Sequence, residues 1–169
     1  MILSFRGKKP LIPASCYISE NVNIIGDVIL GDEVNIWFGA VIRGDMHYIR
    51  IGARTNIQDN CTIHVTTDVS PTILGDEVTV GHNAMIHGCT VENCCLIGMG
   101  AILLDDAIIG EGSIIGAGAL VPPKMVVPPR SLCLGIPARI IRSVSDTEYQ
   151  ENIASAQQYI DFANLYKNK

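Results

Sequence analysis

The sequence predicts an all-β protein, a parallel β-helix of about six triangular coils with a C-terminal α-helix. Three observations lead to this prediction. An aliphatic residue returns every six positions, small or compact residues fill a second fixed place in each repeat, and the period stops before a segment with helical spacing. Such a repeat determines the fold, because each unit buries its apolar side chains only by stacking on its neighbours.

The aliphatic series keeps its phase despite two insertions. A three-residue insertion follows the hexad of Ile42, a five-residue insertion follows that of Ile63, and one turn after Ile86 is a residue short. The period fits neither an α-helix nor a hairpin, and it describes a short flat strand followed by a tight corner. Three hexads form one coil, and coils stack at the strand spacing of about 4.8 Å. The aliphatic positions are Ile12, Ile18, Ile24, Leu30, Ile36, Ile42, Ile51, Ile57, Ile63, Leu74, Val80, Ile86, Val91, Ile97, Leu103, Ile109, Ile115, Val121 and Val127.

Composition excludes several classes of protein. Hydrophobic residues make up 48% of the chain and aromatic residues only 5%, so the apolar side chains are mostly aliphatic and suit stacked strands. The net charge of −5 provides no basic field for nucleic acid or acidic lipid. No apolar run reaches the roughly 18 residues of a membrane span, and the N-terminus does not resemble a signal peptide. We expect a cytoplasmic protein with no nucleic-acid or membrane partner.

The repeat ends after residues 135–138, whose sequence Gly-Ile-Pro-Ala predicts a turn that leaves the prism. Residues 1–140 are assigned to the β-helix, and residues 141–169 to a tail and helix that pack on its outside within a single domain. Residues 145–148, Ser-Asp-Thr-Glu, form a predicted capping box at the start of this helix. The apolar face of the helix is expected to comprise Ile153, Ala156, Ile160, Ala163 and Tyr166.

Two of the four histidines occupy equivalent places in the repeat. His64 and His87 directly follow Ile63 and Ile86, which belong to the third side of successive coils. The repeat therefore stacks the two histidines in one outward-facing column, about 5 Å apart. Imidazoles at that spacing can share a metal ion. Arg43 occupies the same place one coil earlier.

His82 lies on the second side of its coil, with Asp59 directly beneath it in the same column. Five residues and a corner separate His82 from His87, too far for bonds of about 2 Å to one metal within a single chain. If all three histidines bind one metal, His82 comes from a neighbouring subunit, which a homotrimer provides. The same packing brings Arg43 toward Asp59 of the neighbour. The alternative is that these are surface histidines without a ligand.

Three runs of the sequence resemble the gamma-class carbonic anhydrase family, and the resemblance covers nearly the whole chain. They are residues 36–45, Ile-Trp-Phe-Gly-Ala-Val-Ile-Arg-Gly-Asp, residues 51–59, Ile-Gly-Ala-Arg-Thr-Asn-Ile-Gln-Asp, and Val80-Gly81-His82 with His87-Gly88-Cys89. The resemblance implies a left-handed coil and a trimer with a metal at each interface. It implies His64 and His87 from one chain and His82 from the next as ligands.

The same resemblance implies carbonic anhydrase activity. Three neutral imidazoles leave a position for water, and a divalent metal lowers the pKa of that water toward ~7, which gives the hydroxide that attacks CO2 to form bicarbonate. Zn²⁺ is the expected metal, with Fe²⁺, Co²⁺ or Ni²⁺ as alternatives. The other site residues implied are Gln58 on the metal-bound water, Arg43, Asp45 and Asp59 as an interface ion network, and Tyr159 on the terminal helix. For the ion network, the alternative is an interface salt bridge alone, and its aspartates are also candidate hydrogen-bond partners of the ligand histidines.

The chain departs from the most active members of that family near the metal. Met46 follows Asp45, and the loop after His64 contains one acid, Asp68, and no glutamate. Fast proton export is therefore not expected from this loop.

Two other functions fit the same repeat, which hosts more than one chemistry. An acyltransferase acting on coenzyme A thioesters would use a histidine as general base without a metal. A catalytically weak metal-binding trimer would keep the metal but not the activity. Bound metal distinguishes the first alternative from a carbonic anhydrase, and CO2 hydration distinguishes the second.

Overall fold

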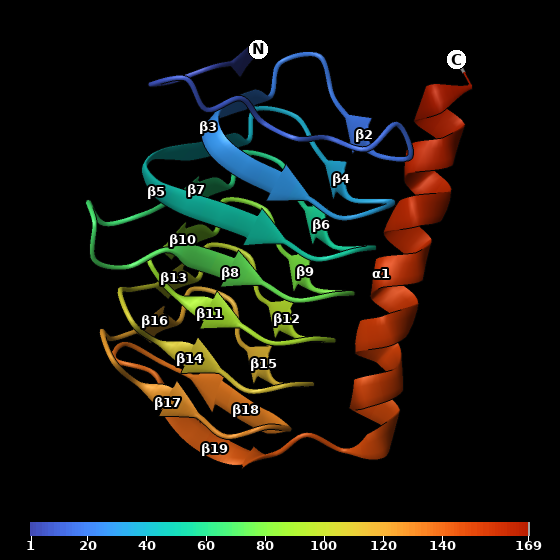
Figure 1. Ribbon diagram of the computed structural model, residues 1–169. Coiled ribbons are helices and arrows are strands. Elements are labelled where there is room, and N and C mark those ends of the chain that lie inside the picture. The colour runs from blue at the N-terminus through green and yellow to red at the C-terminus, as the bar shows by residue number, and fades with distance from the viewer. Residues whose placement is uncertain (169) are drawn as a thin grey trace.

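The computed structural model describes residues 1–168 as a triangular parallel β-solenoid with one long helix along its side (Figure 1). Seven parallel strands stack on the face that carries the helix, so the solenoid has about seven turns. The sequence predicted about six. The stack extends beyond Val127, the last residue of the aliphatic series, because residues 131–134 form one more parallel strand.

The strands group into three faces, which we name A, B and C. Face A consists of β2 (Tyr17–Ile18), β4 (Asn35–Ile36), β6 (Asn56–Ile57), β9 (Thr79–Val80), β12 (Leu96–Ile97), β15 (Ile114–Ile115) and β18 (Ser131–Leu134). Face B contains β7 (Thr62–His64), β10 (Met85–His87), β13 (Ile102–Leu103) and β16 (Leu120–Val121). Face C contains β8 (Thr72–Leu74), β11 (Thr90–Val91), β14 (Ile108–Ile109) and β17 (Val126–Val127).

Two long strands join faces B and C into one sheet. They are β3 (Asn23–Leu30) and β5 (Val41–Ile51), which turn the corner between these faces, and the short β1 (Ile2–Leu3) pairs with β3. At the other end of the solenoid, β19 (Arg139–Ser143) pairs antiparallel with β18 and ends the parallel stack. The predicted turn at residues 135–138 connects these two strands.

The aliphatic residues of the repeat fill the axis of the solenoid. On face A, Ile36 pairs with Ile57, and Ile57 pairs with Val80; all three side chains are 0% exposed. The small place of the repeat is also buried, for example at Ala40 and Cys61. All six cysteines of the chain are free. Removal of this apolar surface from water, worth about 25 cal/mol per Å², is the main force that holds the coils together.

The tight corners of the solenoid fix the positions of outward-pointing side chains beside them. Asn60 (φ 58°) and Asn83 (φ 59°) occupy equivalent corners of successive coils, and asparagine enters this left-handed region more readily than most residues. The backbone N–H of Asn83 donates to the carbonyl oxygen of Asp59 at 2.9 Å. Asp59 and His82, which precede these asparagines, are thereby held at one corner, in successive coils.

The three-residue insertion forms a bulge in β5. Gly26 of β3 pairs with Gly44, but Val28 pairs with Ile49, so the extra residues of β5 project from the corner between faces B and C. Asp45 lies in this bulge. The bulge therefore adds a carboxylate beside face B that a regular hexad would not supply.

The C-terminal helix α1 (Asp146–Lys167) packs along β2, β4, β6 and β9 of face A. The predicted capping box is present: Ser145 accepts from the backbone N–H of Glu148, and the Glu148 carboxylate accepts from that of Ser145. Of the predicted apolar face, Ala156, Ile160 and Ala163 are buried, whereas Ile153 is only partly buried and Tyr166 is 41% exposed. Asn152, which was not predicted, is buried, and its amide donates to the Cys94 carbonyl oxygen at 3.1 Å. Across residues 1–168, no helix has the length and apolarity needed to cross a membrane.

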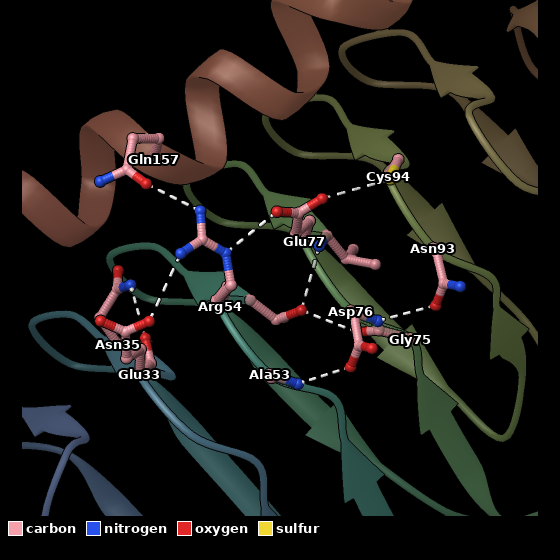
Figure 2. Close-up of polar contacts among 12 residues, drawn as sticks. Glu33, Asn35, Ala53, Arg54, Gly75, Asp76, Glu77, Asn93, Cys94 and Gln157 are labelled. Carbon is pink, nitrogen blue, oxygen red and sulfur yellow. Dashed lines mark hydrogen bonds and ion pairs between the residues drawn. The ribbon is translucent and has the colours of Figure 1, made fainter.

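Polar side chains also attach α1 to the solenoid, as Figure 2 shows. Arg54 donates to Gln157 of α1 at 2.7 Å and to Glu77 of the next coil at 3.0 Å. It also reaches Glu33 of the preceding coil at 3.4 Å. One guanidinium thus connects three coils and the helix on a corner away from the histidines.

Candidate metal centre

The predicted histidine column lies on face B. In the register of β7 and β10, Ile63 pairs with Ile86 and His64 with His87. The buried isoleucines fix the register, and the residue after each must then point outward from the core. The Nδ1 atom of His64 lies 3.2 Å from Nε2 of His87. Two ligand atoms on a tetrahedral metal with bonds of 2.0–2.1 Å are about 3.3 Å apart, so this pair fits a shared metal.

A carboxylate and an arginine stand behind His64. Asp45 in the β5 bulge lies 3.1 Å from His64 Nε2, and Arg43 donates to Asp45 at 2.5 Å. Burial alone would raise the pKa of the Asp45 carboxyl, but the hydrogen bonds from Arg43 and His64 outweigh it and lower that pKa. Burial lowers the pKa of His64, which favours the neutral imidazole that a metal requires.

His82 has its own carboxylate partner. Because Ile57 pairs with Val80, the residues two places further, Asp59 and His82, are also aligned. Nδ1 of His82 lies 2.7 Å from Asp59 Oδ2, which confirms the predicted stacking of these two residues. Nε2 of the His82 imidazole therefore remains available to bind another group. Its side chain is 36% exposed, so a second molecule can reach it.

A third carboxylate, Asp105, was missed in the sequence. Its Oδ1 lies 2.6 Å from Nδ1 of His87, and its Oδ2 accepts from the hydroxyl of Thr66, in the loop between β7 and β8, at 2.8 Å. The repeat frame contained only a partial signal for it. Leu103 pairs with Ile86, so Asp105 lies one coil beyond the histidine column. The residue of the next coil equivalent to His87 is Leu104, so Asp105, one place further, lies beside that column rather than in it.

The three histidines do not form a complete site in one chain. No group of three or more His, Cys, Asp or Glu side chains within residues 1–168 is arranged to hold a metal ion. His64 and His87 meet at one end of face B, whereas His82 lies at the corner where face A ends. This separation agrees with the expectation that His82 serves a neighbouring subunit.

The donor chemistry of this set suits a metal. We call His64, His82 and His87 the candidate ligand histidines. Each has one ring nitrogen on a carboxylate, an arrangement that typically fixes the ring and leaves its other nitrogen for a metal.

Gln58 and Tyr159 lie on the His82 side of the molecule. Gln58 follows Ile57 on face A, is 5% exposed, and donates through Nε2 to Asn56 Oδ1 at 3.1 Å. Tyr159 of α1 lines a pocket of about 460 Å³ together with Asp59 and the aromatic residues Trp37, Phe38, Phe162 and Tyr166. Burial, followed by the charge of Asp59, raises the pKa of Tyr159. Within one chain, Tyr159 therefore lies near Asp59, the partner of His82, and Gln58 directly precedes Asp59 in the sequence.

The histidine geometry coincides with a clear family relationship. A family model described as bacterial transferase hexapeptide (six repeats) matches residues 88–123. A carbonic anhydrase of Geobacillus kaustophilus is 48% identical over 167 residues, which cover 99% of this chain and 91% of that protein. The mitochondrial gamma carbonic anhydrase 2 of Arabidopsis thaliana is 40% identical and covers 96% of this chain, which spans 60% of that protein. The chain belongs to the gamma carbonic anhydrase family.

Solved structures place this member of the gamma carbonic anhydrase family among hexapeptide-repeat proteins. A Bacillus cereus protein described as a candidate acetyltransferase is 44% identical, with a TM-score of 0.96 over 99% of this chain and 96% of that one. A hexapeptide transferase family protein from Anaplasma phagocytophilum is 36% identical, with a TM-score of 0.94 over 98% and 97% of the two chains. The predicted left-handed β-helix of hexapeptide repeats is thereby confirmed.

Proposed function

We propose that this protein hydrates CO2 to bicarbonate reversibly, at a divalent metal site shared between the subunits of a homotrimer. One observation carries the proposal: each candidate ligand histidine has one ring nitrogen on a carboxylate, and two of the free nitrogens lie 3.2 Å apart. His64 and His87 of one chain and His82 of the next would hold the metal. Three imidazole ligands suit Zn²⁺ best, and Fe²⁺, Co²⁺ or Ni²⁺ also accept them.

The residues of the chain would have different roles in the proposed reaction. When bound, the metal supplies a water nucleophile that ionises near neutral pH. The carboxylates of Asp45 and Asp59 would keep the imidazoles of His64 and His82 oriented. Gln58 donates one amide N–H to Asn56, so it would contact the nucleophile or bicarbonate through its second N–H or its amide oxygen.

The remaining candidates would serve the interface. Arg43 is paired with Asp45 in its own chain, and its side chain is 42% exposed. A partly exposed guanidinium of this kind can also reach a carboxylate of a neighbouring subunit, for which we propose Asp59. Tyr159 lies against Asp59 in the pocket of α1, so a neighbour's metal-binding corner seated there would come close to its hydroxyl.

The first test is metal content, measured by mass spectrometry on anaerobically purified protein, with CO2 hydration assayed on the same samples. We expect about one metal ion per chain, as one shared site per subunit requires. His82→Ala is expected to lose both the metal and the activity, because two histidines alone hold a divalent ion poorly. His47→Ala is the matched control. His47 accepts from the Tyr48 backbone N–H and lies outside the ligand set, so metal and activity should remain.

The outcomes separate the candidate functions. Metal and hydration that are both lost in His82→Ala support the interfacial carbonic anhydrase. Metal without hydration in the wild type indicates a metal-binding trimer with another role. Wild-type protein that takes up no metal, even after reconstitution, contradicts the proposal.

The second candidate is acyl transfer from a coenzyme A thioester. The observation that favours it is the Bacillus cereus structure described as a candidate acetyltransferase, which is 44% identical to this chain. His82 bound to Asp59 would then act as a general base without a metal. Metal-free protein that binds coenzyme A, and loses acyl transfer in His82→Ala, would support this function instead.

A further inference from the structure

We infer that Asp105 is the positioning residue for His87, and that it sets which ring nitrogen of His87 is free for the metal. The inference rests on the proposed function and goes beyond it, because it assigns a specific ligand-orienting role to a residue outside the family motifs described above. Its basis is a chain of contacts that runs from Thr66 through Asp105 and His87 to His64.

The first step is the hydrogen bond between Asp105 and His87. An ionised carboxylate only accepts hydrogen bonds, so Nδ1 of His87, at 2.6 Å from Oδ1, must carry the proton. The neutral ring then has its lone pair on Nε2. That is the atom that faces His64 Nδ1 at 3.2 Å, where a shared metal would lie. Asp105 therefore selects the tautomer with the correct nitrogen free.

The second step is the fixed position of the carboxylate itself. Thr66 donates to the other carboxylate oxygen, Oδ2, at 2.8 Å, so neither oxygen of Asp105 is free to rotate away. The residue that orients His87 is thus itself held from the loop after β7.

The third step is the space that the chain leaves for this contact. Gly88 follows His87 with φ +60°, and a Cβ there would lie 2.3 Å from Asp105 Oδ1 and 2.9 Å from Ser70 Cβ. Only glycine allows the carboxylate to approach the backbone so closely. Gly88 therefore leaves room for Asp105 beside His87, as Gly39 does for Asn60 and Gly52 does for Asp76 at other corners of the solenoid.

The test measures the tautomer and the metal affinity separately. Nitrogen-15 NMR of the metal-free protein should show His87 protonated on Nδ1, and Asp105→Ala should abolish that preference. The affinity for Zn²⁺, measured by competition with a chromophoric chelator, should fall by roughly 10–100-fold in the same variant. Asp105→Asn keeps an acceptor but no charge, so its affinity should lie between those of the wild type and Asp105→Ala.

Asp106→Asn is the matched control. Asp106 is the adjacent aspartate, it accepts from Ser70 instead of a histidine, and asparagine tolerates its φ of 60°. Its substitution should change neither the tautomer nor the affinity. A wild-type His87 tautomer together with unchanged Zn²⁺ affinity in Asp105→Ala would overturn the inference. Wild-type protein that binds no Zn²⁺ but has Nδ1-protonated His87 would overturn the proposed function and leave the orientation by Asp105 standing.

Discussion

At the scale of single residues, the candidate centre depends on pairs that the solenoid places in adjacent coils. His64 and His87 are 23 positions apart in sequence and in contact in space. His82 and Asp59, also 23 positions apart, and His87 and Asp105, 18 positions apart, are likewise in contact. Each pair requires only that the hydrophobic register beneath it be kept. Small changes next to these pairs should therefore have local effects that can be measured.

Gly88→Ala is the prediction that belongs to this scale. We expect a loss in the free energy of unfolding from two sources: about 1–2 kcal/mol from the positive φ, and a further ~1–3 kcal/mol from the clash with Asp105 and Ser70. Gly118→Ala is the control, because Gly118 has φ +66° and open space around its Cβ. Chemical denaturation of both variants at equal protein concentration isolates the clash. Equal losses would mean that Asp105 moves aside freely.

At the scale of elements, the C-terminal helix is held at its start by a compact polar cap. Glu148 accepts from the backbone of Ser145 and forms two hydrogen bonds with Arg142, at 2.7 and 2.8 Å. Arg142 lies in β19, so the cap ties the helix to the last strand of the solenoid. The N-terminal end of α1 is therefore held by this cap as well as by the packing of the helix on face A.

The cap predicts a shifted titration. The Arg142 hydrogen bond, followed by those from Ser145, lowers the pKa of Glu148 from 4.5 to about 2. Because the folded-state pKa is depressed, the stabilisation is fully present above the unfolded value of 4.5 and is lost as the pH falls toward 2. Carbon-13 NMR of the Glu148 carboxyl measures this directly. Arg142→Gln should move the midpoint upward, and an unchanged midpoint would contradict the assigned cause.

At the scale of the whole molecule, one continuous aliphatic core runs through all the coils. Each coil contacts only its neighbours, so stability is the sum of many similar interfaces. Along the short strands of faces B and C, inward side chains alternate with outward ones, as Ile109 and Ile108 of β14 illustrate. Ile109 is 0% exposed and Ile108 is 40% exposed. The same residue type thus has two different roles at adjacent positions.

Substitution of this pair tests the organisation of the core. Ile109→Ala should lower the free energy of unfolding by about 2–5 kcal/mol, because it removes buried methyl groups and leaves a cavity. Ile108→Ala, on the outer surface of the same strand, should cost less than about 1 kcal/mol. Thermal and chemical unfolding of the two variants measure the difference. Similar losses would show that face C is covered by another molecule in solution.

The sequence by itself determined the repeat, the register and the histidine column. These follow from local rules: a strict period places each aliphatic residue on the axis, and the residue after it must point outward. The pairing of His64 with His87 and of Asp59 with His82 could be predicted for that reason. The helix start could also be predicted, because a capping box is a contact between residues three positions apart.

Only the tertiary structure decided the contacts that depend on side-chain direction and on irregular segments. The bulge in β5 brings Asp45 to His64, and the loop after β7 brings Thr66 to Asp105. The helical period could not tell Asn152 from Ile153, because a hydrogen bond to Cys94 made the polar residue the buried one. Insertions and buried polar contacts lie outside the hexad pattern, so their geometry depends on the whole packed chain.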